Sequence, residues 1–206
     1  MHQPHIALIH TESVPSEVFS GFTQVISCEG LDLQIKSRKN GGPFAALEWL
    51  LPTAVIVYIS KSYFDGFLKE MGKDHYNLLK QGFQKLREKV IGPSAPTITL
   101  FGSSGKITKE QPYSLVFSVL AEAEPGLRFK LLIQTNVSED EYEEILGAFL
   151  EFLSAFHARS LDAQTIERLV AARVVGDTLL LAFNQDAKAI EPIDPVQKRG
   201  APNESA

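Results

Sequence analysis

The chain has 206 residues, of which 44% are hydrophobic and 22% are charged, and a chain of this size and composition can bury a sizeable core. Its formal net charge of −5 argues against a dedicated nucleic-acid binder, whose affinity depends on neutralising phosphates. A bilayer needs about 20 consecutive apolar residues, whereas the longest mainly apolar stretches, such as "LLPTAVIVYI", are about half as long, so we expect no membrane span.

The first half of the chain alternates strand-like and helix-like segments. Four segments are apolar runs or alternate apolar with polar residues, which predicts strands at 5–10, 31–37, 54–59 and 97–101. The run "AVIVYI" at 54–59 is continuously apolar, as in a strand buried on both faces. Helical periodicity fills the intervals, including a short helix at 44–51. This order predicts an α/β protein with an open, mainly parallel sheet, flavodoxin-like or TIR-like, and helices on both sides.

The third predicted strand leads into one long amphipathic helix, from Ser62 to about Val90. Ser62 with Asp65 three residues later is typical of a helix amino terminus. On the helical wheel Glu70 falls on the polar side, unless Gly72 breaks the helix. Such a break would leave Glu70 on a short separate turn at the rim of the sheet.

The second half predicts a different arrangement. Two strands flanking "EPG" should form an antiparallel hairpin, and a capping box of Ser138 and Glu141 starts a helix. A shorter helix at about 162–172 and a strand, "TLLLAF", follow. We expect residues 113–185 to form a subdomain that shares the core of residues 1–112. Residues 186–206 contain three prolines and no periodicity, which predicts a disordered tail.

Cysteine and histidine usage bounds the chemistry. The single cysteine, Cys28, rules out an internal disulfide and favours a reducing cytoplasm. The amino end lacks the pattern of a secretory signal. One cysteine and five scattered histidines show no metal-ligand spacing, so no metal site is predicted. His75 projects into the apolar face of the long helix and is interpreted as a core histidine.

Polar residues follow the first and third predicted strands. In open parallel sheets, ligands bind beyond the carboxyl ends of the strands, where the strand order reverses. With a strand order of 2-1-3-4, the crevice would lie between Thr11 and Glu12 on one side and Ser60, Ser62 and Tyr63 on the other. We expect a substrate-binding pocket there; ordinary solvated loops are the alternative.

Charge runs on two predicted helices have two interpretations. The run from Lys69 to Lys89 is basic, and "EDEYEE" at 139–144 is acidic. Both are explained by solvated helix faces, and both are also suited to head-to-tail association between copies of the chain.

Residues 5–101 resemble the TIR and TIR-like domain family. The resemblance lies in the order of elements, in the loop "RKNGGP" at 38–43 and in "VIVYISKSYFDGFLKE" at 55–70. In that family the third strand typically ends in a serine, followed by a tyrosine three residues later and by a glutamate in the next helix. Ser60, Tyr63 and Glu70 match these residue types.

The resemblance implies a signalling or defence effector module that acts through self-association or through a partner signalling protein. For enzymatic members it implies hydrolysis of the nicotinamide–ribosyl bond of NAD, a substrate rather than a cofactor, with Glu70 as the catalytic carboxylate. A carboxylate near the ribose can stabilise the oxocarbenium-like transition state of such a reaction. Two alternatives stay open: a non-catalytic adaptor, and a flavodoxin-like module that binds a small nucleotide without turnover.

Overall fold

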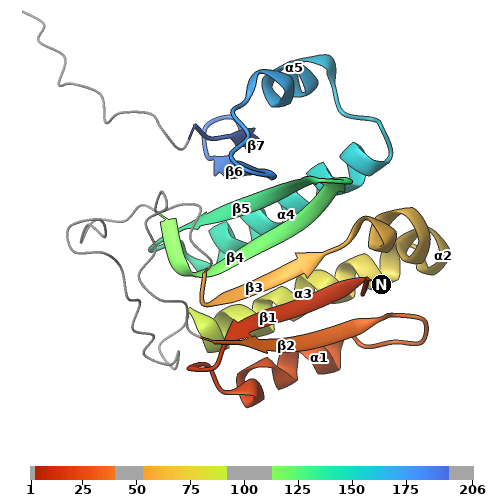
Figure 1. Cartoon of the computed structure of the whole chain (residues 1–206), viewed down its shortest axis with the longest axis vertical. Helices are drawn as coiled ribbons and strands as arrows, with labels where there is room; N and C mark the ends of the chain where they lie inside the picture. The colour runs from red at the N-terminus through yellow and green to blue at the C-terminus, as the bar shows by residue number, and fades with distance from the viewer. Residues whose placement is uncertain (1–2, 40–52, 92–112, 195–206) are drawn as a thin grey trace, which may run out of the picture.

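Seven strands form one open sheet. The computed structural model describes residues 3–39, 53–91 and 113–194, and in these the strand order is β2-β1-β3-β4-β5-β6-β7 (Figure 1). The strands are β1 (Ile6–Thr11), β2 (Leu33–Arg38), β3 (Val55–Ile59), β4 (Tyr113–Glu124), β5 (Leu127–Gln134), β6 (Thr178–Asn184) and β7 (Ala189–Pro192). The predicted α/β class is confirmed. The predicted strand at 97–101, the helix at 44–51 and most of the loop at 38–43 lie outside the described residues.

The sheet is mixed rather than mainly parallel. Strand β1 is parallel to β2, β3 to β4 and β5 to β6, whereas the pairs β1–β3, β4–β5 and β6–β7 are antiparallel. The unexpected pair is β1–β3, in which Ile9 lies opposite Ile56. Because β2 ends and β3 begins at the same edge of the sheet, the chain between them needs no crossover of the kind that joins parallel strands.

The helices cover one face of the sheet. Helices α1 (Ser20–Ile26), α3 (Lys73–Val90) and α4 (Glu139–His157) lie on the same side of the strands (Figure 1). On β3 the side chains of Val55, Val57 and Ile59 point into the core between the sheet and these helices and are fully buried. Ile56 and Tyr58, on the other face, are only half-buried. The prediction that helices cover both faces therefore does not hold for the described helices.

The predicted helix from Ser62 to Val90 is broken into three pieces. A π-helical segment, η3 (Tyr63–Phe67), leads into α2 (Leu68–Met71), and α3 starts after Gly72. Gly72 has φ 69° and ψ −160°, a conformation that favours glycine because it has no Cβ. Ser62 has helical angles and makes no cap hydrogen bond, so the predicted Ser62–Asp65 cap is wrong; the Ser62 hydroxyl contacts that of Ser60 at 2.7 Å instead.

The second half follows its sequence pattern closely. Strands β4 and β5 form the predicted antiparallel hairpin. At the start of α4, the Ser138 hydroxyl accepts from the Glu141 amide at 3.2 Å, and the Glu141 carboxylate accepts from the Ser138 amide at 2.8 Å. The shorter helix, α5 (Ala163–Ala171), starts after Asp162, whose carboxylate accepts from the Thr165 amide at 2.9 Å. These hydrogen bonds satisfy helix amides that have no partner within the helix.

The predicted disordered tail contains a strand. Strand β7 pairs with β6, and Ile190 is buried between the sheet and the helices. The Glu191 carboxylate accepts hydrogen bonds from Arg168 on α5 and from Asn184 on β6. A strand of four residues is too short to show a recognisable alternation of apolar and polar residues. Pairing with β6 and the hydrogen bonds of Glu191 therefore define β7, rather than periodicity.

Candidate functional site

The structure separates the two groups of predicted site residues. Because β1 and β3 are antiparallel, their carboxyl ends lie at opposite edges of the sheet. The Thr11 amide bonds the carbonyl of Ala54 just before β3, whereas the Ser60 amide after β3 bonds the carbonyl of His5 just before β1. Thr11 and Glu12 therefore lie at one edge of the sheet, and Ser60 lies at the opposite edge. No single crevice contains all the predicted binding residues.

Two of the predicted binding residues are part of the core. Ser60 and Tyr63 are both 0% exposed. The Ser60 hydroxyl donates to the His5 carbonyl at 3.2 Å, and the Tyr63 hydroxyl lies 3.1 Å from Nδ1 of His75. Tyr63 thus closes the end of the sheet and offers no ring face to a ligand.

His75 is a core histidine, as its position on the apolar helix face predicted. Its Nε2 lies 2.7 Å from the Ile26 carbonyl; a carbonyl only accepts, so Nε2 carries the proton and Nδ1 accepts from the Tyr63 hydroxyl. Burial lowers the pKa of His75, which keeps the ring neutral at pH 7. Both ring nitrogens are satisfied, and no lone pair is left for a catalytic base.

Glu70 lies on α2 at the rim of the sheet, because the helix breaks at Gly72. Its side chain is exposed and lines a shallow depression of about 410 Å³. The other residues around this depression are His5, Glu29, Gly30, Gly66, Phe67 and Met71. The Nδ1 atom of His5 accepts from the Asp32 amide at 3.1 Å, which fixes the ring. In the part of the chain that the structure describes, no group of three His, Cys, Asp or Glu is placed to hold a metal ion.

A larger hollow lies between α2 and the first turns of α3 on one side and the last turns of α4 on the other. Its volume is about 650 Å³, and we call it the α2–α4 groove. Apolar side chains contribute much of its lining, with Phe64, Leu68 and Tyr76 among them. Its polar residues are Lys69, Asn77, Glu151, Ser154, His157 and Ser160. The π-helical segment and the bend at Gly72 interrupt the helix between Phe64 and Tyr76, which both line the groove.

His157, in the last turn of α4, is held rigidly in the wall of this groove. Its ring stacks on Phe64 with centroids 4.7 Å apart and planes 15° apart, and Phe156 meets it edge-on at 5.4 Å. Its Nε2 is buried without a hydrogen-bond partner, and burial lowers the pKa of the ring. Sequence reasoning missed His157, because a single histidine near a helix end carries no pattern.

Charged residues contact one another beside the α2–α4 groove, at the edge of the sheet where the parallel strands β3 and β4 end. The Lys61 amide donates to the Glu122 carboxylate at 3.0 Å, and the Lys61 ammonium donates to Glu124 at 2.9 Å. Burial, together with the charge and a hydrogen bond of Glu122, raises the pKa of Tyr58 to about 12. These contacts tie the ends of the strands together beside the groove.

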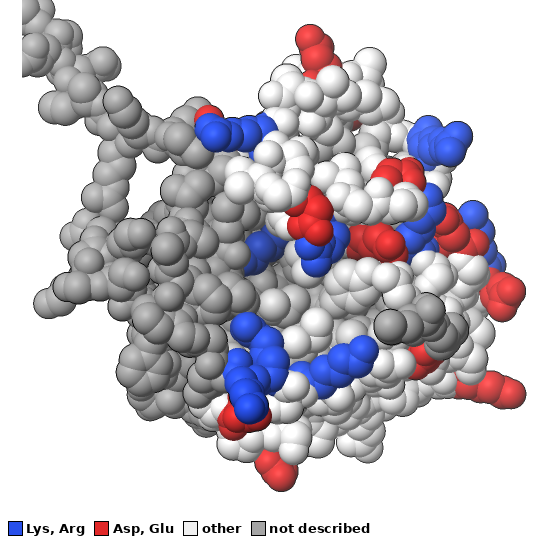
Figure 2. Space-filling model, in the orientation of Figure 1, with Lys and Arg blue, Asp and Glu red and all other residues white. Residues whose placement is uncertain are grey.

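The face of the sheet that α1, α3 and α4 leave open carries positive charge on one side. Figure 2 shows basic side chains gathered on the side of β1 and β2. Lys36 and Arg38 pair with Ile9 and Thr11 and so point to this face. Lys130 is only 6% exposed, and burial together with the charge of Arg38 lowers its pKa to about 8.

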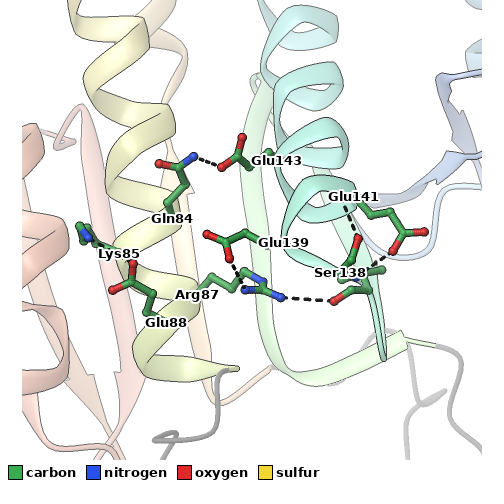
Figure 3. A network of polar contacts seen from close by, with 9 residues as sticks. Gln84, Lys85, Arg87, Glu88, Ser138, Glu139, Glu141 and Glu143 are labelled. Atoms are coloured by element: carbon green, nitrogen blue, oxygen red, sulfur yellow. Dashed lines mark hydrogen bonds and ion pairs between the residues drawn. The ribbon is translucent and has the colours of Figure 1, made fainter.

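The oppositely charged runs on α3 and α4 contact each other within the chain (Figure 3). The Gln84 amide donates to Glu143, Arg87 lies 3.9 Å from Glu139, and Lys80 lies 3.7 Å from Glu151. Arg87 also donates to the Val137 carbonyl at 3.4 Å. Lys80, Gln84 and Arg87 thus connect α3 to α4 within the chain.

None of the described helices is long and apolar enough to cross a membrane. Comparisons with protein-family models, with curated proteins and with solved structures give no match for the chain. The described residues define an α/β protein with an open, mixed sheet and a half-open groove beside the carboxyl ends of β3 and β4.

Proposed function

We propose that the chain is a non-catalytic binding module that holds a small molecule in the α2–α4 groove. The observation that carries this proposal is the groove itself, a hollow of about 650 Å³ with an aromatic and aliphatic lining and a few polar groups. Small-molecule sites typically enclose about 300–1,000 Å³ and share this lining. A small nucleotide or another compound with an aromatic ring fits the volume and the aromatic side chains of Phe64 and Tyr76.

A titration followed by amide NMR of the full chain tests this proposal. Nucleosides, nucleotides and simple aromatic amides are added in turn, and a groove ligand is expected to shift the amides of Asn77, Ser154 and Ser160. Ala155→Trp places a large ring at the groove wall and should weaken binding at least tenfold. Ala171→Trp, at an exposed position on α5, is the matched control and should leave binding unchanged. Binding that survives Ala155→Trp, or shifts confined to another surface, would contradict the proposal.

A second candidate function is NAD cleavage at Glu70 by a self-associating TIR-like effector. The break at Gly72 favours it, since it places Glu70 in an open depression with Glu29 and His5. The burial of Ser60 and Tyr63 weighs against it, because these two residues would have to contact the substrate.

Release of free nicotinamide from NAD decides between the two candidates. If Glu70 stabilises a ribosyl cation, Glu70→Gln should lower turnover by about 10²-fold or more, equivalent to about 2.7 kcal/mol of transition-state stabilisation. Glu17→Gln, an exposed carboxylate elsewhere, is the control. The protein is assayed at concentrations high enough for self-association. Release that Glu70→Gln preserves rules out Glu70, and no release by the associated wild type supports the binding module.

A further inference from the structure

Helix α5 and the chain that follows it turn apolar side chains to solvent. The helix lies at one end of the molecule beside β7, apart from α1 and α3 (Figure 1), and none of its residues is buried. Leu169 packs against the core, whereas Ile166, Val170 and Val174 are 47%, 82% and 43% exposed. Three of the five large hydrophobic side chains that are exposed in the described part of the chain are thus in this segment.

The same three side chains border a hollow of about 430 Å³, which we call the α5 hollow. Its other walls come from the β4–β5 hairpin, the end of α4 and β6, and are mostly apolar, with Leu127, Phe129, Phe156 and Leu179 among them. Single exposed apolar side chains are ordinary on a protein surface, whereas a contiguous group of them indicates a contact surface.

The charges around this surface are balanced in sign. Glu124 and Arg159 line the hollow. Glu167 and Arg173 are exposed, and within the described ranges neither of them belongs to an ion pair. A helix that lies on a membrane has a polar face rich in lysine and arginine, whereas α5 itself carries one glutamate and one arginine. A protein partner with both signs of charge therefore fits this surface better than an anionic membrane.

These residues are arranged symmetrically about Val170. Ile166 and Val174 lie four residues before and after it, and Glu167 and Arg173 lie three residues before and after it. In an antiparallel pair of α5 helices with a two-fold axis beside Val170, residues equally far from Val170 on opposite sides come together. Glu167 of each copy then faces Arg173 of the other, and Ile166 faces Val174. Every such contact is made twice, as in an isologous interface.

The match extends past the end of the helix. Helix α5 ends at Ala171, and Ala172 has the extended angles φ −73° and ψ 147°. A residue advances about 1.5 Å along a helix and about 3.3 Å in extended chain, which places Glu167 about 4.5 Å from Val170 along the axis and Arg173 at most about 8 Å from it. The long side chains of glutamate and arginine can span this difference.

We infer that two copies of the chain associate through α5 and the α5 hollow, with the helices antiparallel about a two-fold axis beside Val170. Because α5 has only nine residues, the contact is smaller than the roughly 800 Å² per partner of a stable complex, and Kd should be on the order of 10–100 µM. The inference does not rest on the proposed function, since the α2–α4 groove and the α5 hollow have no lining residue in common.

Sedimentation equilibrium of the full chain, from about 10 to about 800 µM, measures the association. The average mass should rise from that of a monomer towards that of a dimer. Val170→Glu places two carboxylates side by side across the axis and should weaken the association at least tenfold. Met71→Glu, at another exposed apolar side chain, is the matched control and should leave the association unchanged. Circular dichroism checks that both variants are folded.

An exchange of charges tests the register of the two helices. Glu167→Arg brings arginines of the two copies together on both sides of the axis, and Arg173→Glu does the same with glutamates. Each single variant should weaken the association about threefold or more at low salt, where exposed charges are least screened. The double variant, Glu167→Arg with Arg173→Glu, restores opposite charges and should recover the affinity of the wild type.

Three results would overturn the inference. The first is a chain that stays monomeric at the highest concentration or an association that Val170→Glu leaves unchanged. The second is a double variant that associates as weakly as the single variants, because the helices would then not meet in this register. The third is a monomeric chain that binds vesicles of phosphatidylcholine and phosphatidylserine and loses this binding with Val170→Glu, which would assign the surface to a membrane.

Discussion

A buried histidine joins three segments of the chain. His75 links Tyr63, twelve residues before it, to Ile26, 49 residues before it. The sequence predicted that His75 lies in the core, because the helical period places it among apolar residues. It did not predict the partners of His75, which lie on other segments. The same limit applies to Tyr63. From the sequence, a tyrosine after a strand can either cover the sheet or face a ligand. Its contact with His75 in the structure shows that it covers the sheet.

Replacing His75 by Phe should lower the free energy of unfolding by about 2 kcal/mol, because the Tyr63 hydroxyl and the Ile26 carbonyl would stay buried without partners. Urea denaturation followed by circular dichroism measures this loss. Glu70→Gln is the control and should change stability by less than about 0.5 kcal/mol, because Glu70 is exposed. A His75→Phe protein as stable as the wild type would show that water or a rearrangement replaces the hydrogen bonds.

Stability should fall as the pH drops below about 6.5, the ordinary pKa of histidine. Burial lowers the pKa of His75 and of His157 in the folded chain, so the unfolded chain binds more protons between the folded pKa values and 6.5. The free energy of unfolding therefore rises with pH across this window. Urea denaturation at pH 7.5 and 5.5 measures the difference, and the ring ¹H shifts report both titrations. Equal stability at the two pH values would contradict the neutral, buried state of these rings.

At the scale of the elements, alternation of residues located the strands but not their directions. The pattern of β3 is the same whichever way the strand runs, and the segment between β2 and β3 is long enough for either connection. The antiparallel pairing of β1 and β3 moves Thr11 and Glu12 to the edge opposite Ser60. The predicted crevice failed for this reason, although each of its residues follows the predicted strand.

The one-sided cover of β3 predicts different tolerances at neighbouring positions. Val57→Asp should unfold the chain, because Val57 is 0% exposed and an unpaired buried charge costs more than about 4 kcal/mol. Ile56→Asp lies on the half-buried face. It should lower the free energy of unfolding clearly less than Val57→Asp does, and the chain should stay folded. Thermal melts followed by circular dichroism distinguish the two. A cooperative melt of Val57→Asp near the wild-type temperature would mean that the face under α3 is open.

The contact between α1 and α3 depends on Gly82. A Cβ atom at this position would lie 2.6 Å from Cγ2 of Ile26 and 3.1 Å from Cδ2 of Phe22. Gly82→Ala should therefore lower the free energy of unfolding by about 1–3 kcal/mol through overpacking. In the matched change, Gly66→Ala, a Cβ meets nothing within 4 Å, and stability should be kept or slightly raised. If both variants have the same free energy of unfolding as the wild type, α1 can shift to make room for the added Cβ atom at no cost in stability.

At the scale of the whole molecule, one core runs under the sheet from β1 to β7. Buried residues of the first half, such as Phe83, and of the second half, such as Phe117 and Phe149, belong to the same cluster. The sequence predicted the helices and hairpin of the second half because a capping box, an N-cap residue and turn residues act locally. It did not predict β7, which pairs with β6 and whose Glu191 also contacts Arg168 on α5.

Two truncations test where the folded unit ends. Deleting residues 187–206 removes β7 and with it the buried Ile190 and the Arg168–Glu191 contact, so the melting temperature should fall by several degrees, at about 2–4 °C per kcal/mol. Deleting only 195–206, a polar segment with a single branched apolar residue, Val196, should leave it within about 1–2 °C, less than 1 kcal/mol on the same scale. Differential scanning calorimetry measures both. Equal melting temperatures for the two truncations would show that β7 contributes nothing.

The order of the strands also bears on how the chain folds. Apart from β2, which lies outside β1, the strands occupy the sheet in the order in which they are synthesised. From β3 onwards, each strand as it emerges from the ribosome meets a partner that is already in place. The hairpins β4–β5 and β6–β7 close short turns and form quickly, whereas helices separate β3 from β4 and β5 from β6 along the chain. From β3 onwards the described strands are thus added at one side of the sheet, and the short strand β7 is the last of them.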